Sequence, residues 1–147
     1  MTATPDTGHI DGQVQVQGRF NAQGVRIDVD GTPAATTTSN GDFETSGVPQ
    51  GTHVVRAWLQ GYLPAEKADV SVTIGQTTTL PAVQLRGGDV DGDNEVGLLD
   101  LVTVASNYHT TPPDDPRADI NADGWVDLFD LVLVAGNYQL TGPIQWP

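Results

Sequence analysis

Residues 89–108 read DVDGDNEVGLLDLVTVASNY, and residues 119–138 read DINADGWVDLFDLVLVAGNY. Placed over each other at an offset of 30 residues, the two segments are identical at eleven of their twenty positions. Agreement of this length and regularity indicates a duplicated supersecondary unit rather than a chance similarity. The duplicated unit therefore decides the fold of the C-terminal part of the chain.

Each copy begins with twelve residues that carry side-chain oxygens at the first, third, fifth and twelfth places. Calcium is a hard cation that takes six to eight oxygen ligands, and a loop with this spacing wraps around one ion. The seventh place contributes its backbone carbonyl, and the ninth place reaches the ion through water. We therefore expect two Ca²⁺ ions, held by Asp89, Asp91, Asp93, Glu95 and Asp100 in the first copy and by Asp119, Asn121, Asp123, Trp125, Asp127 and Asp130 in the second.

Two places in the loops depend on backbone conformation or on water. The sixth place turns sharply with a positive φ, which suits Gly124, and Asn94 is the best substitute for glycine there. At the ninth place Asp127 can reach the ion through water, whereas Gly97 cannot, so water alone fills that position in the first loop. Two complete loops at matching spacing argue against ordinary turns without metal. Catalytic metal binding is disfavoured because the loops close on their ion. Paired carboxylates for glycoside hydrolysis are disfavoured because every acid of the loops is accounted for as a ligand.

The segment after each loop is rich in β-branched residues but has the period of a helix. Apolar residues recur at i, i+3, i+4 and i+7 in both copies, which predicts one buried face between two antiparallel helices. Asn107 and Asn137, near the helix ends, are expected to act as C-terminal caps. The expected core residues are Leu101, Val104, Ala105 and Tyr108, repeated as Leu131, Val134, Ala135 and Tyr138.

Residues 88–138 resemble a dockerin of a type I-like kind. The resemblance is carried by a calcium loop, a valine at its eighth place and Asp-Leu within a short helix, all repeated after a linker. The resemblance implies docking onto a cohesin-like domain, with the tenth and eleventh places supplying recognition. A helix that is apolar nearly all round also needs a cover for its second face, from a partner or from the rest of the chain. The expected partner-binding residues are Leu98, Leu99, Val102, Ala105, Ser106, Leu128, Phe129, Val132, Leu133, Ala135 and Gly136.

Two further hypotheses concern the repeat. Because its copies are alike, two docking orientations 180° apart are conceivable. The three prolines between residues 109 and 117 leave little room for a middle helix. In the tail, Trp146 or Pro143 is expected to fold back toward Leu85.

Residues 9–86 read as short alternating strands separated by turn signals, which predicts a small antiparallel sandwich. Its turns resemble the carboxypeptidase-regulatory-like, prealbumin-type sandwiches, through residues 12–14, 39–43, 48–55 and 61–62. The expected fold is thus two domains, an all-β antiparallel sandwich of immunoglobulin-like or prealbumin-like type at 9–86 and a small α domain of two calcium-loop–helix repeats at 87–147. The linker, residues 85–88, spans about 14 Å at most, so the domains are expected to touch.

Charge and composition narrow the function. The net charge of −13 is concentrated in residues 89–147, where eleven acids face Arg117 alone. This segment would repel nucleic acid and anionic membranes. No apolar run is long enough for membrane insertion, and without cysteine there is no disulfide or thiolate chemistry. The N-terminal residues lack the features of a signal peptide. Because the resemblance of the sandwich implies a secreted context, we expect a fragment of an extracellular or cell-surface protein.

These observations favour a non-catalytic docking module that is monomeric when unbound and belongs to a cellulosome-like assembly. One alternative is a calcium-rigidified spacer or adhesin segment, which requires the apolar helix face to be buried against the sandwich. Another is a carbohydrate-binding module with Trp58, Tyr62 or Trp125 as a sugar platform. Trp58 lies in an alternating strand and is expected in the core instead.

Overall fold

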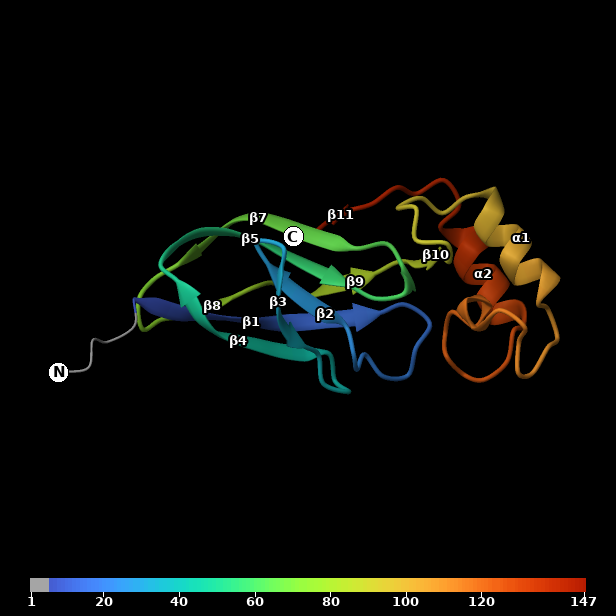
Figure 1. Cartoon of the computed structure of the whole chain (residues 1–147), viewed down its shortest axis with the longest axis horizontal. Coiled ribbons are helices and arrows are strands. Elements are labelled where there is room, and N and C mark those ends of the chain that lie inside the picture. Colours follow the sequence, from blue (N-terminus) through green and yellow to red (C-terminus); the bar gives the residue numbers. More distant parts are fainter. Residues whose placement is uncertain (1–5) are drawn as a thin grey trace.

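Two packed sheets form the larger part of the computed structural model, which describes residues 6–147 (Figure 1). The first sheet has the order β4-β1-β8, and β9 also pairs with β1. The second has the order β11-β7-β5-β2-β3. The strands are β1 (Thr7–Val16), β2 (Arg26–Val29), β3 (Thr32–Thr36), β4 (Asp42–Pro49), β5 (Gly51–Trp58), β7 (Ala65–Val72), β8 (Thr77–Thr79), β9 (Val83–Leu85) and β11 (Ile144–Gln145).

Alternating side chains of the two sheets fill the space between them, as period-2 patterning requires. Val14, Ile27 and Val55 are fully buried there. The sandwich departs from the expected antiparallel arrangement, because β1 runs parallel to both β8 and β9, and β11 runs parallel to β7. Strand β3 contains Pro33, and the missing N–H of this proline is tolerated because β3 lies at the edge of its sheet.

The duplicated segment forms two helices, α1 (Leu98–Ser106) and α2 (Leu128–Gly136), packed on each other at one end of the sandwich (Figure 1). Asn107 and Asn137 are their C-terminal caps, as expected. The proline-rich connection holds a single turn of 3₁₀ helix, η1 (Pro116–Ala118). Within residues 6–147, no helix has the length and apolar character needed to cross a membrane.

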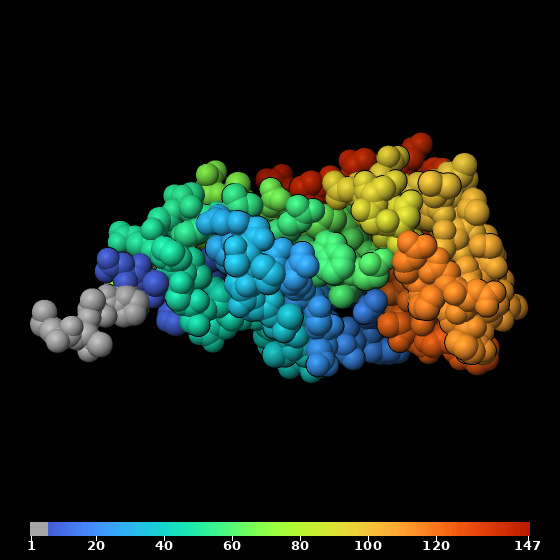
Figure 2. Space-filling view, viewed as in Figure 1, coloured from blue at the N-terminus to red at the C-terminus, as the bar shows by residue number. Residues whose placement is uncertain are grey.

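Within the expected linker, only Arg86 lies outside a strand, because Leu85 ends β9 and the two glycines belong to β10 (Gly87–Asp89). β10 pairs antiparallel with β6 (Gly61–Tyr62), and both glycines of β10 are buried. Tyr62 of the sandwich and Ile120 and Val134 of the repeat belong to one hydrophobic core. The space-filling view shows the repeat set directly against the sandwich (Figure 2). The first calcium-type loop therefore begins inside a sheet rather than after a flexible connection.

Hydrogen bonds fix the repeat on the sandwich. The Asn137 side-chain amide donates to the Gln17 side-chain oxygen and to the Gly87 carbonyl, both at 2.7 Å. The Arg19 guanidinium donates twice to the Ile120 carbonyl, at 3.1 and 3.0 Å. The Tyr62 hydroxyl also donates to the Ile120 carbonyl, at 3.3 Å. These buried and part-buried polar contacts set one geometry for the junction.

The C-terminal tail returns to the sandwich. Ile144 and Trp146 donate their backbone N–H groups to carbonyls of the Pro64–Glu66 segment, at 2.8 and 3.0 Å. Trp146 is 1% exposed, packs edge-on against Phe43 with ring centroids 5.9 Å apart, and donates its indole N–H to the Pro81 carbonyl. The expectation that the tail folds back is confirmed for Trp146, and its ring partner is an aromatic side chain.

Candidate metal centres and docking face

The first loop gathers four carboxylates around one point. Asp89, Asp91, Asp93 and Asp100 each offer an oxygen, and these oxygens lie within 4.8 Å of one another. Asp89 ends strand β10, and Asp100 lies in the first turn of α1, so the sheet and the helix bring the two ends of the loop together. Both side chains are buried, which places negative charge where water cannot solvate it.

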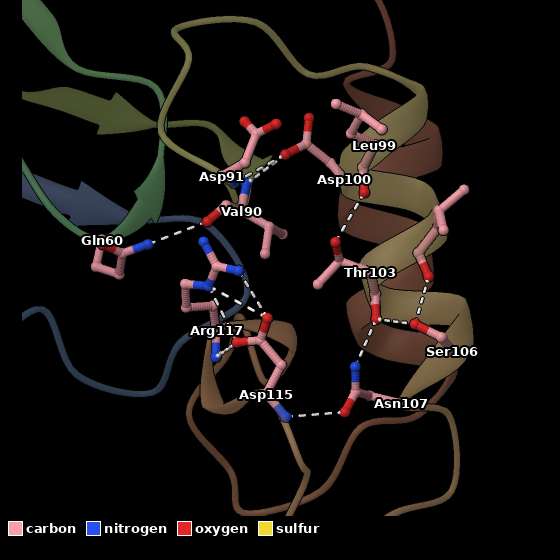
Figure 3. A network of polar contacts seen from close by, with 11 residues as sticks. Gln60, Val90, Asp91, Leu99, Asp100, Thr103, Ser106, Asn107, Asp115 and Arg117 are labelled. Atoms are coloured by element: carbon pink, nitrogen blue, oxygen red, sulfur yellow. Dashed lines mark hydrogen bonds and ion pairs between the residues drawn. The ribbon is translucent and has the colours of Figure 1, made fainter.

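Backbone N–H groups orient the carboxylates of Asp89 and Asp100. One Asp100 oxygen accepts from Val90 and Asp91 at 2.7 and 3.1 Å (Figure 3). The other accepts from Gly97 at 2.7 Å. Asp89 accepts from Gly92 and Asn94 at 3.0 and 3.1 Å. The loop is thus wrapped around its own acids. Because each carboxylate oxygen has two lone-pair sites, lone pairs remain for a cation.

The second loop repeats this arrangement 30 residues later. Asp119, Asp123 and Asp130 form a second acidic cluster. Asp130 accepts from the backbone of Ile120, Asn121 and Asp127, at 2.8, 3.2 and 3.0 Å, which matches the contacts of Asp100. The duplication in sequence is therefore a duplication in hydrogen bonding.

Other expected ligands occupy distinct positions in the second loop. The Asn121 amide lies beside Asp123 and donates to its carboxylate at 3.2 Å. Asp127 caps α2 by accepting from the Phe129 N–H at 2.9 Å, outside the cluster of three acids. Trp125, like Glu95 in the first loop, exposes its side chain, as expected of a residue whose contribution is a carbonyl.

The crowding of acids changes their protonation. Burial, together with the charges of Asp100 and Asp93, raises the pKa of Asp89 to about 6, although the N–H groups of Asn94 and Gly92 oppose the rise. Burial and the charge of Asp119 also raise the pKa of Asp130. Arg117, the only basic residue after residue 88, is paired with Asp115 at 2.7 Å. All-oxygen clusters without a protein counterion have the chemistry of a calcium site, and the residues present fit that ion.

The turn geometry confirms the sequence reading of the sixth place. Asn94 has φ +73° and Gly124 has φ +92°. Asn94 also binds the tail. Its side-chain amide donates to the Gly142 carbonyl, and its backbone carbonyl accepts from the Gly142 N–H at 2.9 Å. The tail thus clasps the first loop.

The two loops exchange equivalent contacts with the opposite helix ends. The His109 N–H, after α1, donates to the Val126 carbonyl at 2.8 Å. The Gln139 N–H, after α2, donates to the Val96 carbonyl at 2.7 Å. These paired bonds show the pseudo-twofold relation between the copies.

The helices present an apolar face to solvent. Six large apolar residues of this face are more than half exposed, and small residues continue it toward the helix ends. We call these residues the docking face: Leu98, Leu99, Val102, Ala105, Ser106, Leu128, Phe129, Val132, Ala135 and Gly136.

Leu133 was wrongly expected on this face. It is 6% exposed, because it packs against Gly18 of the sandwich and Gly87 of β10. A Cβ placed on Gly18 would lie 3.1 Å from a Leu133 methyl, and one on Gly87 would lie 3.4 Å from it. The sequence of the repeat alone does not reveal that a neighbouring sheet covers this position.

The expected helix core was too wide. Val104 and Val134 are fully buried, and Leu101 and Leu131 are partly buried. Ala105, Tyr108, Ala135 and Tyr138, assigned to the same face, are exposed. Two nine-residue helices bury only a narrow stripe against each other, so residues at the edge of the periodic pattern remain in solvent.

Tyr62 and Trp58, two of the aromatic residues considered as a sugar platform, differ in solvent exposure. Tyr62 is buried at 2% exposure beneath Arg19, whose guanidinium carbon lies 5.3 Å from the ring centroid. Trp58, expected in the core, is 37% exposed and lies beneath the Arg26 guanidinium at 5.0 Å. Val55 and Ala57 of β5 are buried, so the alternation of the strand places Trp58 on its solvent face.

Sequence reasoning missed the residues that join the two parts. Their side chains make four hydrogen bonds across the junction. The Arg19 guanidinium donates two of these bonds, and the Gln17 side-chain oxygen accepts the other two. Phe20, in the same turn, is fully exposed beside α2. Its only sequence signal is a large aromatic residue within a polar turn.

Comparisons with known proteins agree with this geometry. The family model described as carboxypeptidase regulatory-like domain matches residues 9–86. No curated protein sequence matches the chain. Two solved structures, an N-terminal and a C-terminal interface mutant of the type II Cohesin-X-Dockerin complex from Acetivibrio cellulolyticus, contain a similar chain. In each case the TM-score is 0.76 and the identity 26%, over 90% of this chain and 96% of the other.

The match to the X-dockerin chain includes both the sandwich and the repeat, so a sandwich followed by two acidic loop–helix units is the shared architecture. Both matched complexes are of type II, whereas the sequence suggested a type I-like repeat.

Proposed function

We propose that this chain, which belongs to the carboxypeptidase regulatory-like domain family, is a non-catalytic, calcium-dependent docking module that binds a cohesin-like domain. The observation that carries the proposal is the match, over nearly its whole length, to an X-dockerin chain that was solved in complex with a cohesin. Such a module attaches an extracellular or cell-surface protein to a larger assembly. We divide it into a stabilising sandwich, residues 9–86, and a docking unit, residues 87–147.

In this proposal the two acidic clusters hold one Ca²⁺ each. Calcium supplies the positive charge that lets buried carboxylates converge, and the protein supplies the oxygens. The side chains of the two clusters and of Asn121 bind directly, and Glu95 and Trp125 contribute their carbonyls. Asp127 caps α2 with one oxygen and holds a calcium-bound water with the other. Through Asp100 and Asp130, each ion then fixes the first turn of a helix.

The exposed docking face supports a partner rather than a spacer role. A spacer requires the sandwich to cover the apolar helix face, yet only Leu133 of the expected recognition residues is covered in that way. Leu98, Leu99, Leu128 and Phe129 remain 60% to 68% exposed. A contiguous exposed apolar surface of this kind is typical of a protein interaction site.

Calcium dependence is tested with a matched set of variants. Isothermal titration with calcium should show two sites in the wild-type chain, one in Asp89→Asn and one in Asp119→Asn. Asp114→Asn, an exposed acid outside both clusters, is the control and should keep both sites. Chelator should remove both the helical circular dichroism and binding to cohesin domains, and helices that persist in excess chelator would contradict the coupling of metal and folding.

The docking face is tested separately, at saturating calcium. The double variant Leu128→Asp, Phe129→Asp should keep both calcium sites and lose the partner, because two charges would be buried without counterions. Ile74→Asp, on a similarly exposed apolar residue of the sandwich, should bind as the wild type does. Equal binding by all three proteins would exclude this face as the interface.

A further inference from the structure

Phe20 is the most exposed large apolar residue of the chain segment described, at 107% of the reference exposure. It lies in the turn between β1 and β2, beside α2. Leaving a phenylalanine in water is unfavourable relative to burying its apolar surface. An exposed aromatic side chain next to an apolar helix face calls for a partner on physical grounds.

The turn that carries Phe20 is held on both sides. The preceding residue, Arg19, donates its backbone N–H to the Val16 carbonyl and its guanidinium to the Ile120 carbonyl. The second residue after it, Ala22, is buried and donates to the Ser39 carbonyl at 3.0 Å. Phe20 is thus presented by a fixed backbone, so covering its ring has to order the side chain but not the turn that carries it.

Between Phe20 and α2 lies a groove of about 360 Å³. Its apolar wall is formed by the rings of Phe20 and Phe129 and by Val132 and Leu133. Asn121 and Asp123 of the second loop lie at its polar edge. Because Phe129 and Val132 also belong to the docking face, the groove continues that face onto the sandwich.

We propose that Phe20 is a recognition residue of the docking module, and that the groove between Phe20 and α2 takes an apolar side chain of the cohesin-like partner. The inference rests on the proposed function, from which it takes the partner. It adds that the sandwich contributes directly to the interface, through one aromatic anchor.

This anchor makes the two copies of the repeat unequal. Phe20 stands beside α2, where Phe129 and Leu133 complete the apolar wall. The corresponding residues of α1 are Leu99 and Thr103, and the Thr103 hydroxyl is turned to the Leu99 carbonyl at 2.8 Å. Of two docking orientations related by the pseudo-twofold axis, only the one led by α2 gains the groove. The interface is therefore expected to use one orientation.

The test measures binding of the full chain, at saturating calcium, to a panel of cohesin domains that includes the type II cohesin of the Acetivibrio cellulolyticus complex. Phe20→Ser should weaken binding about tenfold or more, as expected for an aromatic anchor. Ile74→Ser, the matched control on a distant exposed residue, should leave the affinity unchanged. Thermal unfolding of Phe20→Ser should equal that of the wild type, because the exposed ring packs on nothing.

A double-mutant cycle of Phe20→Ser with Phe129→Ser should be non-additive, because both rings would contact one partner side chain. A photo-reactive phenylalanine analogue at position 20 should crosslink to the bound cohesin. Affinity of Phe20→Ser within about twofold of the wild type, or a crosslink to a second copy of this chain, would overturn the inference and leave the proposed function intact. A wild-type chain that binds no cohesin of the panel would overturn both.

Discussion

Replacing Leu133 by alanine tests how the repeat is joined to the sandwich. The side chain is 6% exposed and fills the space above Gly18 and Gly87. Truncation of a buried leucine to alanine lowers the free energy of unfolding by about 2–5 kcal/mol, and the loss grows with the volume of the cavity that remains. Neither glycine has a side chain that can move into the gap. We therefore expect a loss toward the upper part of that range, about 3–4 kcal/mol.

The matched control is Val132→Ala, one residue earlier on the same helix. Val132 is 55% exposed and belongs to the docking face. Its truncation should change the free energy of unfolding by less than about 1 kcal/mol. The two variants should therefore separate, with Leu133→Ala affecting stability and Val132→Ala affecting partner binding.

The assay is urea unfolding at a fixed excess of calcium, followed by tryptophan fluorescence and by circular dichroism. Coincident transitions in the two signals would show that the sandwich and the repeat unfold together, which validates a single free energy. At equal slopes, the Leu133→Ala midpoint should lie well below that of Val132→Ala. Identical midpoints for the two variants would refute the packing of Leu133 on the sandwich.

Two further predictions concern other contacts. The nitrogens of His53 lie 2.6 Å from the Asp30 carboxylate and the Pro49 carbonyl, and the hydrogen bond to Asp30 raises the pKa of His53. This stabilisation is complete below the unfolded pKa of about 6.5 and is lost as the pH rises through the higher folded pKa. The unfolding midpoint of the wild type should therefore fall over this pH window, whereas that of His53→Gln should stay flat. Parallel curves for the two proteins would contradict a stabilising bond from His53 to Asp30. Asn94→Gly keeps the positive φ but loses the side-chain bond to Gly142, so calorimetry should show weaker calcium binding at the first loop only. Equal weakening at both loops would argue against a local clasp.

The parts of the fold that follow local rules could be predicted from the sequence. The two loops and helices were predicted because ligand spacing and helical period act within about twenty residues. The positive φ of Asn94 followed from the turn that such a loop needs. The strands with strict alternation, such as those around Val14 and Val55, were predicted for the same reason.

The junction could not be predicted, because it depends on contacts between distant residues. A Gly87-Gly88 pair is typical of a linker, yet here it is a strand paired with Gly61 and Tyr62. The missing side chains of Gly18 and Gly87 create the site for Leu133, which no pattern within the repeat encodes.

The same limit applies to Phe20 and to the direction of β1. Exposure of Phe20 beside α2 depends on where the sandwich places its turn relative to the repeat. The parallel pairing of β1 with β8 and β9 depends on the path of the chain after β7. The alternation of side chains along a strand is the same in parallel and antiparallel pairs, so it does not reveal the direction of the partner strand.

Strands β10 and β11 give the repeat two fixed ends. The repeat leaves the sandwich at β10, beside Tyr62, and returns to it at β11, beside Ala65. If calcium were withdrawn while the sandwich stayed folded, the intervening segment would become a tethered loop rather than a free tail. Such a loop has fewer unfolded conformations available, so less chain entropy is lost when the ions return. If the proposed ions bind, the sandwich thereby keeps the emptied repeat close to the state that holds them.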